Sequence, residues 1–463
     1  MSTTPIDTQA PAPVSFGQAL LFWLKLGFIS FGGPAGQIAI MQRELVDEKR
    51  WISQGRFNHA LNYCMLLPGP EAQQLATYIG WLMHRTWGGI VAGGLFVLPS
   101  FFIIIALSWI YVRFGQVPVV AALFYGIQCA VAAIVLHALW RVASKVLKNP
   151  AKAPVLCAVA AMSFIAIEFA HIAFPWIVAI AALIGWLGSK WAPAQFTGSG
   201  GHGTSKNAAA SALIDDDTPT PAHAQFSRTR LAVVLGAGIV LWSLPMLWLV
   251  VTLGWQGSLT QIGWFFTKAA MVTFGGAYAV LPYVVQGAVD QYQWLTAPQM
   301  MAGLALGEST PGPLIMIVAF VGFLGGWAKT VLGPDALFLG AVLAATVATW
   351  FTFLPSFVFI LAGGPVIEST HGKLGFTAPL TAITAAVVGV IASLALLFIS
   401  NVALHSAPSV ASGTPMPFWS TVDFGALLIM GAAAVALFRY KAGVISVIAA
   451  CAMAGLTTQW LFT

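Results

Sequence analysis

The sequence predicts an all-α polytopic membrane protein composed of two homologous, inverted repeats of about six helices, some of them broken by glycine and proline. Composition and an internal repeat support this fold class. The chain is 59% hydrophobic and only 7% charged, whereas a soluble domain carries roughly 25% charged residues. Apolar stretches of about 20 residues recur along the chain, which favours membrane-spanning helices over a barrel.

The internal repeat lies in residues that bend membrane helices. The matching segments are 25–33 (KLGFISFGG) with 268–276 (KAAMVTFGG), the Pro-Gly-Pro sequences at 68–70 and 311–313, and Leu-Pro-Ser at 98–100 and 354–356. The first two pairs share an offset of 243 residues, and the third has an offset of 256. Two copies of one broken membrane unit are typical of secondary transporters, whose substrate site lies between the repeats.

Thirteen apolar segments follow one another as six, one and six. They are 15–38, 57–83, 86–112, 118–140, 154–170 and 172–189, then 231–253, then 260–285, 298–327, 335–362, 376–400, 419–437 and 441–460. The polar stretch in the middle is too hydrophilic to form a core. The predicted domains are a polar tail at 1–14, the first repeat at 15–190, a disordered cytoplasmic linker at 191–230, a connecting helix at 231–255 and the second repeat at 256–463.

The single extra helix has a topological consequence. Six crossings return the chain to its starting side, so one more crossing makes the second repeat start from the opposite face and inverts it. With the N-terminus in the cytoplasm, twelve Lys and Arg residues fall inside and six outside, as the positive-inside rule requires. If the segment around Gly32-Gly33 is re-entrant instead, the charged loop from Arg43 to Arg56 moves inside and the count of thirteen crossings fails.

Several classes of chemistry lack support in the sequence. The cysteines at 64, 129, 157 and 451 lie in apolar segments without metal or redox spacing. No cluster of His, Cys and Asp suggests a metal, and no phosphate-binding loop suggests direct use of ATP. We expect no metal, no cofactor, no enzymatic activity and no nucleic-acid partner, and the oligomeric state stays open.

Taken together, three motifs resemble the chromate ion transporter family in its long form with two homologous halves. They are Phe31-Gly32-Gly33-Pro34 followed by Trp51, Leu67-Pro68-Gly69-Pro70 followed by Glu71 and Gln73-Gln74, and the echoes at 274–276 and 311–313. The resemblance covers both halves. It implies a multi-pass protein of the bacterial cytoplasmic membrane that exports chromate, driven by the membrane potential or a proton gradient.

Two lysines are candidate substrate-binding residues. Lys25 and Lys268 each precede a glycine, Gly32 or Gly275, by seven residues, which is two turns of a continuous helix and one shared face. A lysine near the bilayer centre costs at least a few kcal/mol, so two at equivalent positions suggest paired cations facing a tetrahedral dianion. The alternative for Lys25 is that its side chain extends to the membrane interface.

The glycine pairs are candidates for backbone binding of an anion. Gly32-Gly33 and Gly275-Gly276 weaken their helices and free backbone N–H groups. Such groups suit an anion because they donate hydrogen bonds without a counter-charge. The alternative is close helix packing at a small-residue interface.

The Pro-Gly-Pro sequences are predicted to split their helices at Gly69 and Gly312. The half-helix that starts there would direct its positive dipole end at the middle of the membrane. In the second repeat, Ser309 and Thr310 precede this break and offer hydroxyl groups. The alternative is a simple kink.

Two carboxyl groups flank these breaks. Glu71 and Glu308 are not repeat-equivalent. Either would repel a bound anion unless it carried a proton, which makes both candidate proton carriers in a coupled cycle. For Glu71 the alternative is a carboxylate that stabilises the start of its helix.

The favoured function is a secondary transporter that exports chromate by alternating access around a midplane site. On this hypothesis, Lys25→Ala or Lys268→Ala loses export while the protein still inserts. Sulfate and other tetrahedral oxyanions, or a channel mechanism, are alternatives because size and charge barely distinguish these ions. A membrane enzyme acting at the charged loop 43–56 is a further alternative.

Overall fold

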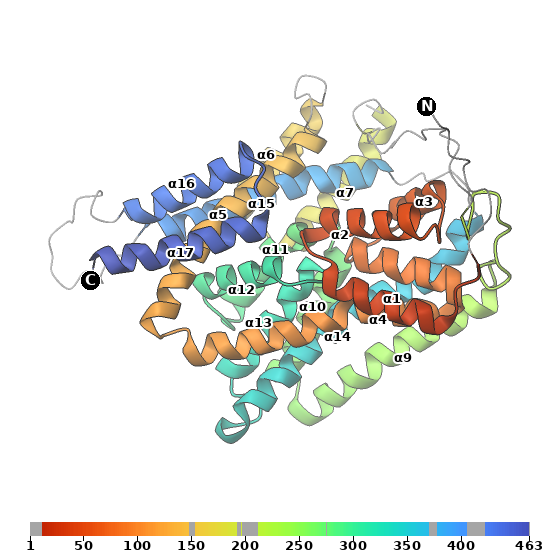
Figure 1. The fold of residues 1–463 in the computed structure, drawn as a ribbon, viewed down its shortest axis with the longest axis horizontal. Coiled ribbons are helices and arrows are strands. Elements are labelled where there is room, and N and C mark those ends of the chain that lie inside the picture. The colour runs from red at the N-terminus through yellow and green to blue at the C-terminus, as the bar shows by residue number, and fades with distance from the viewer. Residues whose placement is uncertain are drawn as a thin grey trace, which may run out of the picture.

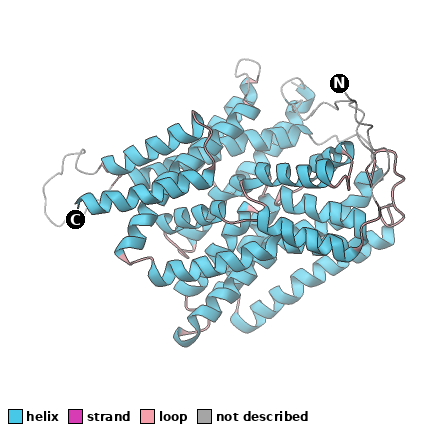
Figure 2. Cartoon of the chain, viewed as in Figure 1, coloured by secondary structure: helices cyan, strands magenta, loops and turns pink. Residues whose placement is uncertain are grey.

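The computed structural model describes residues 12–147, 153–191, 196, 212–274, 276–369, 377–404 and 422–462. These residues are almost entirely helical (Figure 2), which confirms the all-α prediction. Six of the described helices are long and apolar enough to cross a membrane. They are α4 (Glu71–Phe114), α5 (Pro118–Val146), α7 (Phe174–Trp191), α9 (Arg228–Leu253), α14 (Leu337–Ser369) and α15 (Thr377–Ala403).

Shorter helices complete the two halves (Figure 1). The first half has α1 (Phe16–Ile29), α2 (Gly33–Gln42), the π-helical turn η1 (Arg43–Glu48), α3 (Gln54–Cys64) and α6 (Pro154–Glu168). The second half has α10 (Ser258–Val272), α11 (Ala277–Val285), η2 (Gln286–Gln291), α12 (Ala297–Ser309), η3 (Leu314–Met316), α13 (Ile317–Ala328), η4 (Pro334–Ala336), α16 (Phe424–Phe438) and α17 (Val444–Phe462).

The first predicted membrane segment, 15–38, is a hairpin of two short helices. With 14 residues, α1 is about 21 Å long at 1.5 Å per residue, too short for a hydrocarbon core of about 30 Å. The chain then turns back: Lys25 Nζ of α1 lies 3.3 Å from Glu44 Oε1 beyond α2, and the rings of Phe22 and Trp51 are 4.7 Å apart.

The second predicted segment, 57–83, also folds back on itself. The rings of Tyr63 in α3 and Tyr78 in α4 lie 6.0 Å apart, so the two helices run side by side from the break at 68–70. A second reversal follows within α4, at the non-helical residues His84 and Arg85. Only the part of α4 after this reversal extends across the molecule.

The second half repeats this arrangement. Phe265 of α10 stacks on Tyr283 of α11 at 4.9 Å, and a Cβ atom at Gly303 of α12 would lie 2.4 Å from the ring of Phe320 in α13. The expectation of thirteen crossings is therefore wrong, because 15–38, 57–83, 260–285 and 298–327 are pairs of short helices. For the segment around Gly32-Gly33, the fold-back agrees with the re-entrant alternative.

The two halves remain inverted with this new count. Between the first hairpin and α10 the chain passes through the long part of α4, then α5, the pair α6–α7, and α9. The pair α6–α7 returns to its starting face, so the number of membrane crossings between α1 and α10 is odd. The helix α10 therefore starts from the face opposite to α1. Packing between the halves is reciprocal: α5 contacts α16 and α17, while α15 contacts α6 and α7.

Part of the predicted disordered linker is ordered against the first half, which corrects that expectation for residues 212–227. Ile214 pairs with Ile52, the Ser53 hydroxyl donates to Asp216 Oδ1 at 2.6 Å, and a ring nitrogen of His223 lies 3.0 Å from the carbonyl oxygen of Trp81. Residues 192–195 and 197–211 lie outside the described residues. We call the surface of the molecule that carries residues 212–224 the linker face.

A buried ion pair joins the halves at the linker face. Arg56 Nη1 of α3 lies 3.1 Å from Glu368 Oε2 of α14, and both side chains are less than a tenth exposed. The Tyr78 hydroxyl donates to Glu368 Oε1 at 2.5 Å, and Arg56 Nη2 donates to the carbonyl oxygen of Thr218 at 2.5 Å. One network therefore connects the second hairpin, the end of α14 and the linker.

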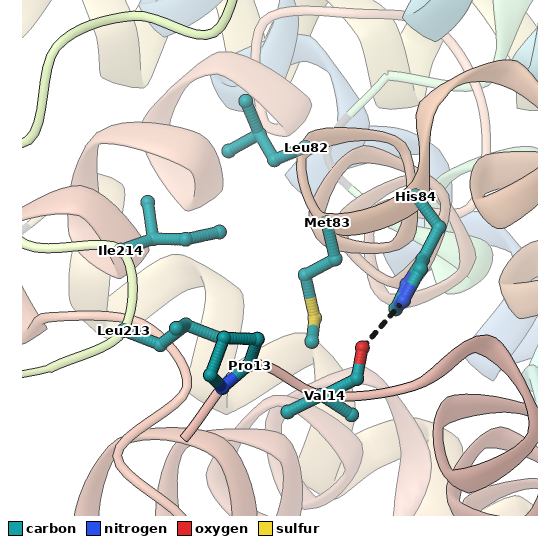
Figure 3. Close-up of a pocket in the computed structure, with 7 residues that line it drawn as sticks. All are labelled: Pro13, Val14, Leu82, Met83, His84, Leu213 and Ile214. Atoms are coloured by element: carbon teal, nitrogen blue, oxygen red, sulfur yellow. Dashed lines mark hydrogen bonds between the residues drawn. The ribbon is translucent and has the colours of Figure 1, made fainter. Parts of the chain in front are cut away.

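A pocket also lies at the linker face. It has a volume of about 220 Å³ and is lined by Pro13, Val14, Leu82, Met83, His84, Leu213 and Ile214 (Figure 3). Six of these side chains are apolar, and the His84 ring is held by the carbonyl oxygen of Val14 at 2.9 Å. This pocket offers few groups that would bind an anion and contains no predicted site residue.

Candidate functional site

The four helix breaks meet in pairs across the two halves. The N–H of Gly69 donates to the carbonyl oxygen of Thr273 at 2.8 Å, and the N–H of Gly312 donates to that of Ser30 at 2.8 Å. Gly69 and Gly312 are repeat equivalents, as are Ser30 and Thr273. The same contact is thus made once in each direction, which is the signature of a two-fold axis between the halves.

Only glycine fits at the two donor positions. Gly69 and Gly312 have φ values of +128° and +94°, which side chains rarely adopt. A Cβ atom at Gly69 would lie 2.3 Å from Ser356 Oγ, and one at Gly312 would lie 2.7 Å from Ser100 Cβ. Ser100 and Ser356 are themselves repeat equivalents, so the two-fold relation extends to the helices behind the breaks.

Four helices start at these breaks without a capping side chain. Their N-cap residues are Gly32 for α2, Pro70 for α4, Gly276 for α11 and Pro313 for η3, which continues directly into α13, and none makes a side-chain cap hydrogen bond. Away from the breaks, α1, α3 and α12 are capped by Ser15, Ser53 and Thr296, whereas α5, α6, α9 and α10 also start without a side-chain cap. The uncapped starts leave N–H groups and positive dipole ends free for a ligand.

The starts of these helices enclose a small cavity, which we call the break cavity. It is lined by Pro34, Gln37, Pro70, Glu71, Ala72, Ala277, Pro313, Leu314 and Ile315 and has a volume of about 10 Å³. That volume holds no more than about one water molecule. Helix starts that converge on one point form a ready-made site for an anion.

Buried polar groups without a hydrogen-bond partner among the described residues surround the breaks. They are the hydroxyls of Ser30, Ser100 and Ser356 and the amide oxygens of Gln37, Gln73 and Gln74. Buried polar atoms are normally satisfied, so the three hydroxyls suggest a ligand that accepts hydrogen bonds, whereas the amide oxygens can only accept them. Sequence reasoning missed the serines and Gln37. The repeated Leu-Pro-Ser motif was the available signal for two of them.

The two lysines do not line the break cavity. Lys25 is 58% exposed and forms its ion pair with Glu44, whereas the Lys268 ammonium lies 5.9 Å from the ring centroid of Trp264. The predicted shared face requires a continuous helix from each lysine to its glycine. Because α1 ends at Ile29 and α10 ends at Val272, the shared face does not extend to either glycine.

The remaining backbone and hydroxyl candidates lie at the breaks. Gly33 starts α2 and Gly276 precedes α11, and both have positive φ values. Gly275 lies outside the described residues. The Ser309 hydroxyl donates to the carbonyl oxygen of Leu306 and the Thr310 hydroxyl to that of Gly307, so both protons are used within α12.

Comparison with known proteins identifies the relatives of this chain. The family model described as chromate transporter matches residues 17–186 and 260–456, one region in each half. The chain belongs to the chromate transporter family. No solved structure matches it.

Named members of the chromate transporter family align over most of the chain. A chromate transport protein of Pseudomonas aeruginosa is 32% identical over 457 residues, covering 98% of this chain and 95% of that protein. A chromate transport protein of Cupriavidus metallidurans is 31% identical over 398 residues, covering 84% and 86%. A shorter relative, the uncharacterized transporter YwrA of Bacillus subtilis, is 30% identical over 120 residues, which cover 26% of this chain and 67% of that protein.

In this member of the chromate transporter family, the two acidic candidates occupy different settings. Glu71 lines the break cavity at the first turn of α4. Glu308 is buried at the end of α12, where it accepts a hydrogen bond from the hydroxyl of Tyr278 in α11. The guanidinium of Arg141 in α5 lies 5.8 Å from the centroid of the Tyr278 ring. Sequence reasoning identified neither Tyr278 nor Arg141.

Proposed function

We propose that this protein exports chromate from the cytoplasm and binds the anion at the break cavity. The observation that carries the proposal is the convergence of four uncapped helix starts on one point. Their N–H groups and the hydroxyls of Ser30, Ser100 and Ser356 would donate hydrogen bonds to the oxygen atoms of a tetrahedral oxyanion. The names of the aligned relatives support chromate as that anion.

Transport on this proposal requires the hairpins to move. A cavity of about 10 Å³ is too small for an ion of five heavy atoms, given that about one water fills it. The contact between Gly69 and Thr273 and the contact between Gly312 and Ser30 would open in turn, one towards each face of the membrane. Such alternation of two inverted repeats around a fixed site is the usual behaviour of secondary transporters.

The membrane potential alone favours export of a dianion. Each elementary charge gains about 2.3 kcal/mol of free energy per 100 mV. At an inside-negative potential of about 150 mV, outward movement of two negative charges is therefore favoured by about 7 kcal/mol. Proton coupling is therefore optional in energetic terms. If it occurs, we propose Glu71 as the carrier, because its carboxyl lines the break cavity and would repel chromate unless protonated. Glu308 is the second candidate.

We propose that the N-terminus is cytoplasmic. The hairpin of α1 and α2 returns the charged segment 43–56 to the face on which the chain starts. Among the cations of the loops, this leaves Arg113 and Lys329 on the opposite face. The positive-inside rule then assigns the linker face to the cytoplasm more strongly than the topology with thirteen crossings did.

The two lysines remain in the proposal as sources of positive potential near the breaks. We expect Lys25→Ala and Lys268→Ala to raise the KM for chromate a few-fold in vesicle transport, since neither ammonium lines the break cavity. Glu44→Gln is the informative control for Lys25, because it removes the partner carboxylate and should lower KM. Equal impairment by Lys25→Ala and Glu44→Gln would contradict an electrostatic role.

Chromate uptake into everted membrane vesicles tests the function. With a respiratory substrate supplied, export appears as accumulation, and we expect it to disappear when an uncoupler is added. Uptake in the presence of excess sulfate ranks the two ions. Vesicles that contain the protein in the membrane but accumulate no more chromate than vesicles lacking it would overturn the proposal.

A further inference from the structure

The side chains around the breaks do not follow the two-fold symmetry of the backbone. Arg141 and Lys145 lie four residues apart on α5, and therefore on one face of that helix. The Arg141 guanidinium lies over the ring of Tyr278, two residues after the break at Gly276. Lys145, one turn nearer the end of α5, interacts electrostatically with Glu71 of the break cavity.

The Arg141 guanidinium keeps its hydrogen-bonding capacity. Within the described parts of the chain, it makes no hydrogen bond and no ion pair, and its recorded contact is the face of the Tyr278 ring. The residue is half-buried. Its charge acts on the carboxyl of Glu308, but no ion pair joins the two. A planar fork of donors is thus held beside the helix breaks by an aromatic ring that uses none of them.

The opposite half has no equivalent of this arrangement. At the offset of 256 that relates α5 to α15, Arg141 corresponds to Leu397 and Lys145 to Asn401. At the offset of 243, Tyr278 corresponds to Ala35. The fixed charge beside the breaks therefore belongs to one side of the two-fold axis. Because the pair α6–α7 returns the chain to the face on which α5 ends, we infer that α5 ends on the same side of the membrane as the linker.

We propose that Arg141, assisted by Lys145, is a one-sided receiving site that takes the tetrahedral dianion at the linker face and passes it to the break cavity. The proposal rests on the proposed function. A guanidinium binds two oxygen atoms of an oxyanion at once, whereas an ammonium acts as a point charge. Arg141 makes the specific contact, and Lys145 raises the local concentration of anions along α5. Release at the other face, past Leu397 and Asn401, meets no such cation.

The test compares the two faces of the membrane. We expect Arg141→Gln to raise the KM for chromate at least about tenfold in everted vesicles, where the linker face is outside. The KM measured for uptake into right-side-out vesicles, driven by an imposed inside-positive potential, should stay within about twofold of wild type. Lys190→Gln is the matched control, because Lys190 lies over Trp186 at 4.1 Å and away from the breaks. It should change neither value.

A variant that moves the cationic residue from one half to the equivalent position in the other sharpens the test. The double variant Arg141→Leu with Leu397→Arg moves the cation to the equivalent position, so the lower KM should now appear in right-side-out vesicles. Equal changes on both faces, or no change on either, would overturn the receiving site while leaving chromate export intact. Absence of chromate transport by wild type would instead overturn the proposed function, and the receiving site with it.

Discussion

Gly312→Ala is expected to reduce chromate transport at least about tenfold while the protein is still inserted. The residue has a φ of +94°, and holding alanine there costs on the order of 1–3 kcal/mol. Its Cβ atom would also lie 2.7 Å from Ser100 Cβ, which pushes the break away from α4. The contact with Ser30 would then be lost. Uptake by everted vesicles, normalised to the amount of protein in the membrane, measures the effect.

The equivalent residue allows an internal check of this prediction. Gly69→Ala should have a similar effect, because its φ is +128° and the new Cβ atom would lie 2.3 Å from Ser356 Oγ. Gly94→Ala is the control, since a Cβ atom there meets nothing within 4 Å. Wild-type transport by both Gly69→Ala and Gly312→Ala would show that the breaks do not form the site.

Glu368→Ala is expected to destabilise the protein by about 3–5 kcal/mol, because it leaves the buried Arg56 guanidinium without its carboxylate. The pair is 3.1 Å apart and less than a tenth exposed. Thermal unfolding in detergent, followed by tryptophan fluorescence, measures the change.

A double variant separates the ion pair from simple packing. Arg56→Leu with Glu368→Leu removes both charges, so it should be much more stable than Glu368→Ala alone. If the double variant is as unstable as the single one, the loss comes from packing and from the hydrogen bonds of Tyr78 and Thr218. Unchanged unfolding of Glu368→Ala would show that the pair contributes nothing.

The sequence predicted the repeat and the breaks because each depends on local residues. Gly69 and Gly312 lie between prolines, and such a sequence interrupts a helix in any surroundings. The duplicated Leu-Pro-Ser motif was used only as evidence of the repeat, although it places Ser100 and Ser356 at equivalent positions. The family resemblance, based on the same motifs, is confirmed by the match to both halves.

The parts that sequence reasoning did not reach depend on the direction of the chain after each break. A broken apolar segment can continue across the membrane or fold back, and its composition is the same in both cases. Lys25 illustrates the consequence: seven residues from Gly32 define a shared face only if the helix continues, and α1 stops at Ile29. The position of Arg141 beside Tyr278 depends on packing between halves, which no local pattern encodes.

The orientation of α9, the single helix between the two halves, determines the orientation in which the second half inserts into the membrane during synthesis. This helix lies at the periphery, with only 17% of its apolar stretch buried inside the protein. At its start, Arg230 donates to the carbonyl oxygens of Ala222 and His223. If the translocon skipped this one helix, every later segment would be inserted upside down. Gly312 could then no longer reach Ser30. The orientation of a single lipid-facing segment is therefore a checkpoint in biogenesis, although it contributes no residue to the break cavity.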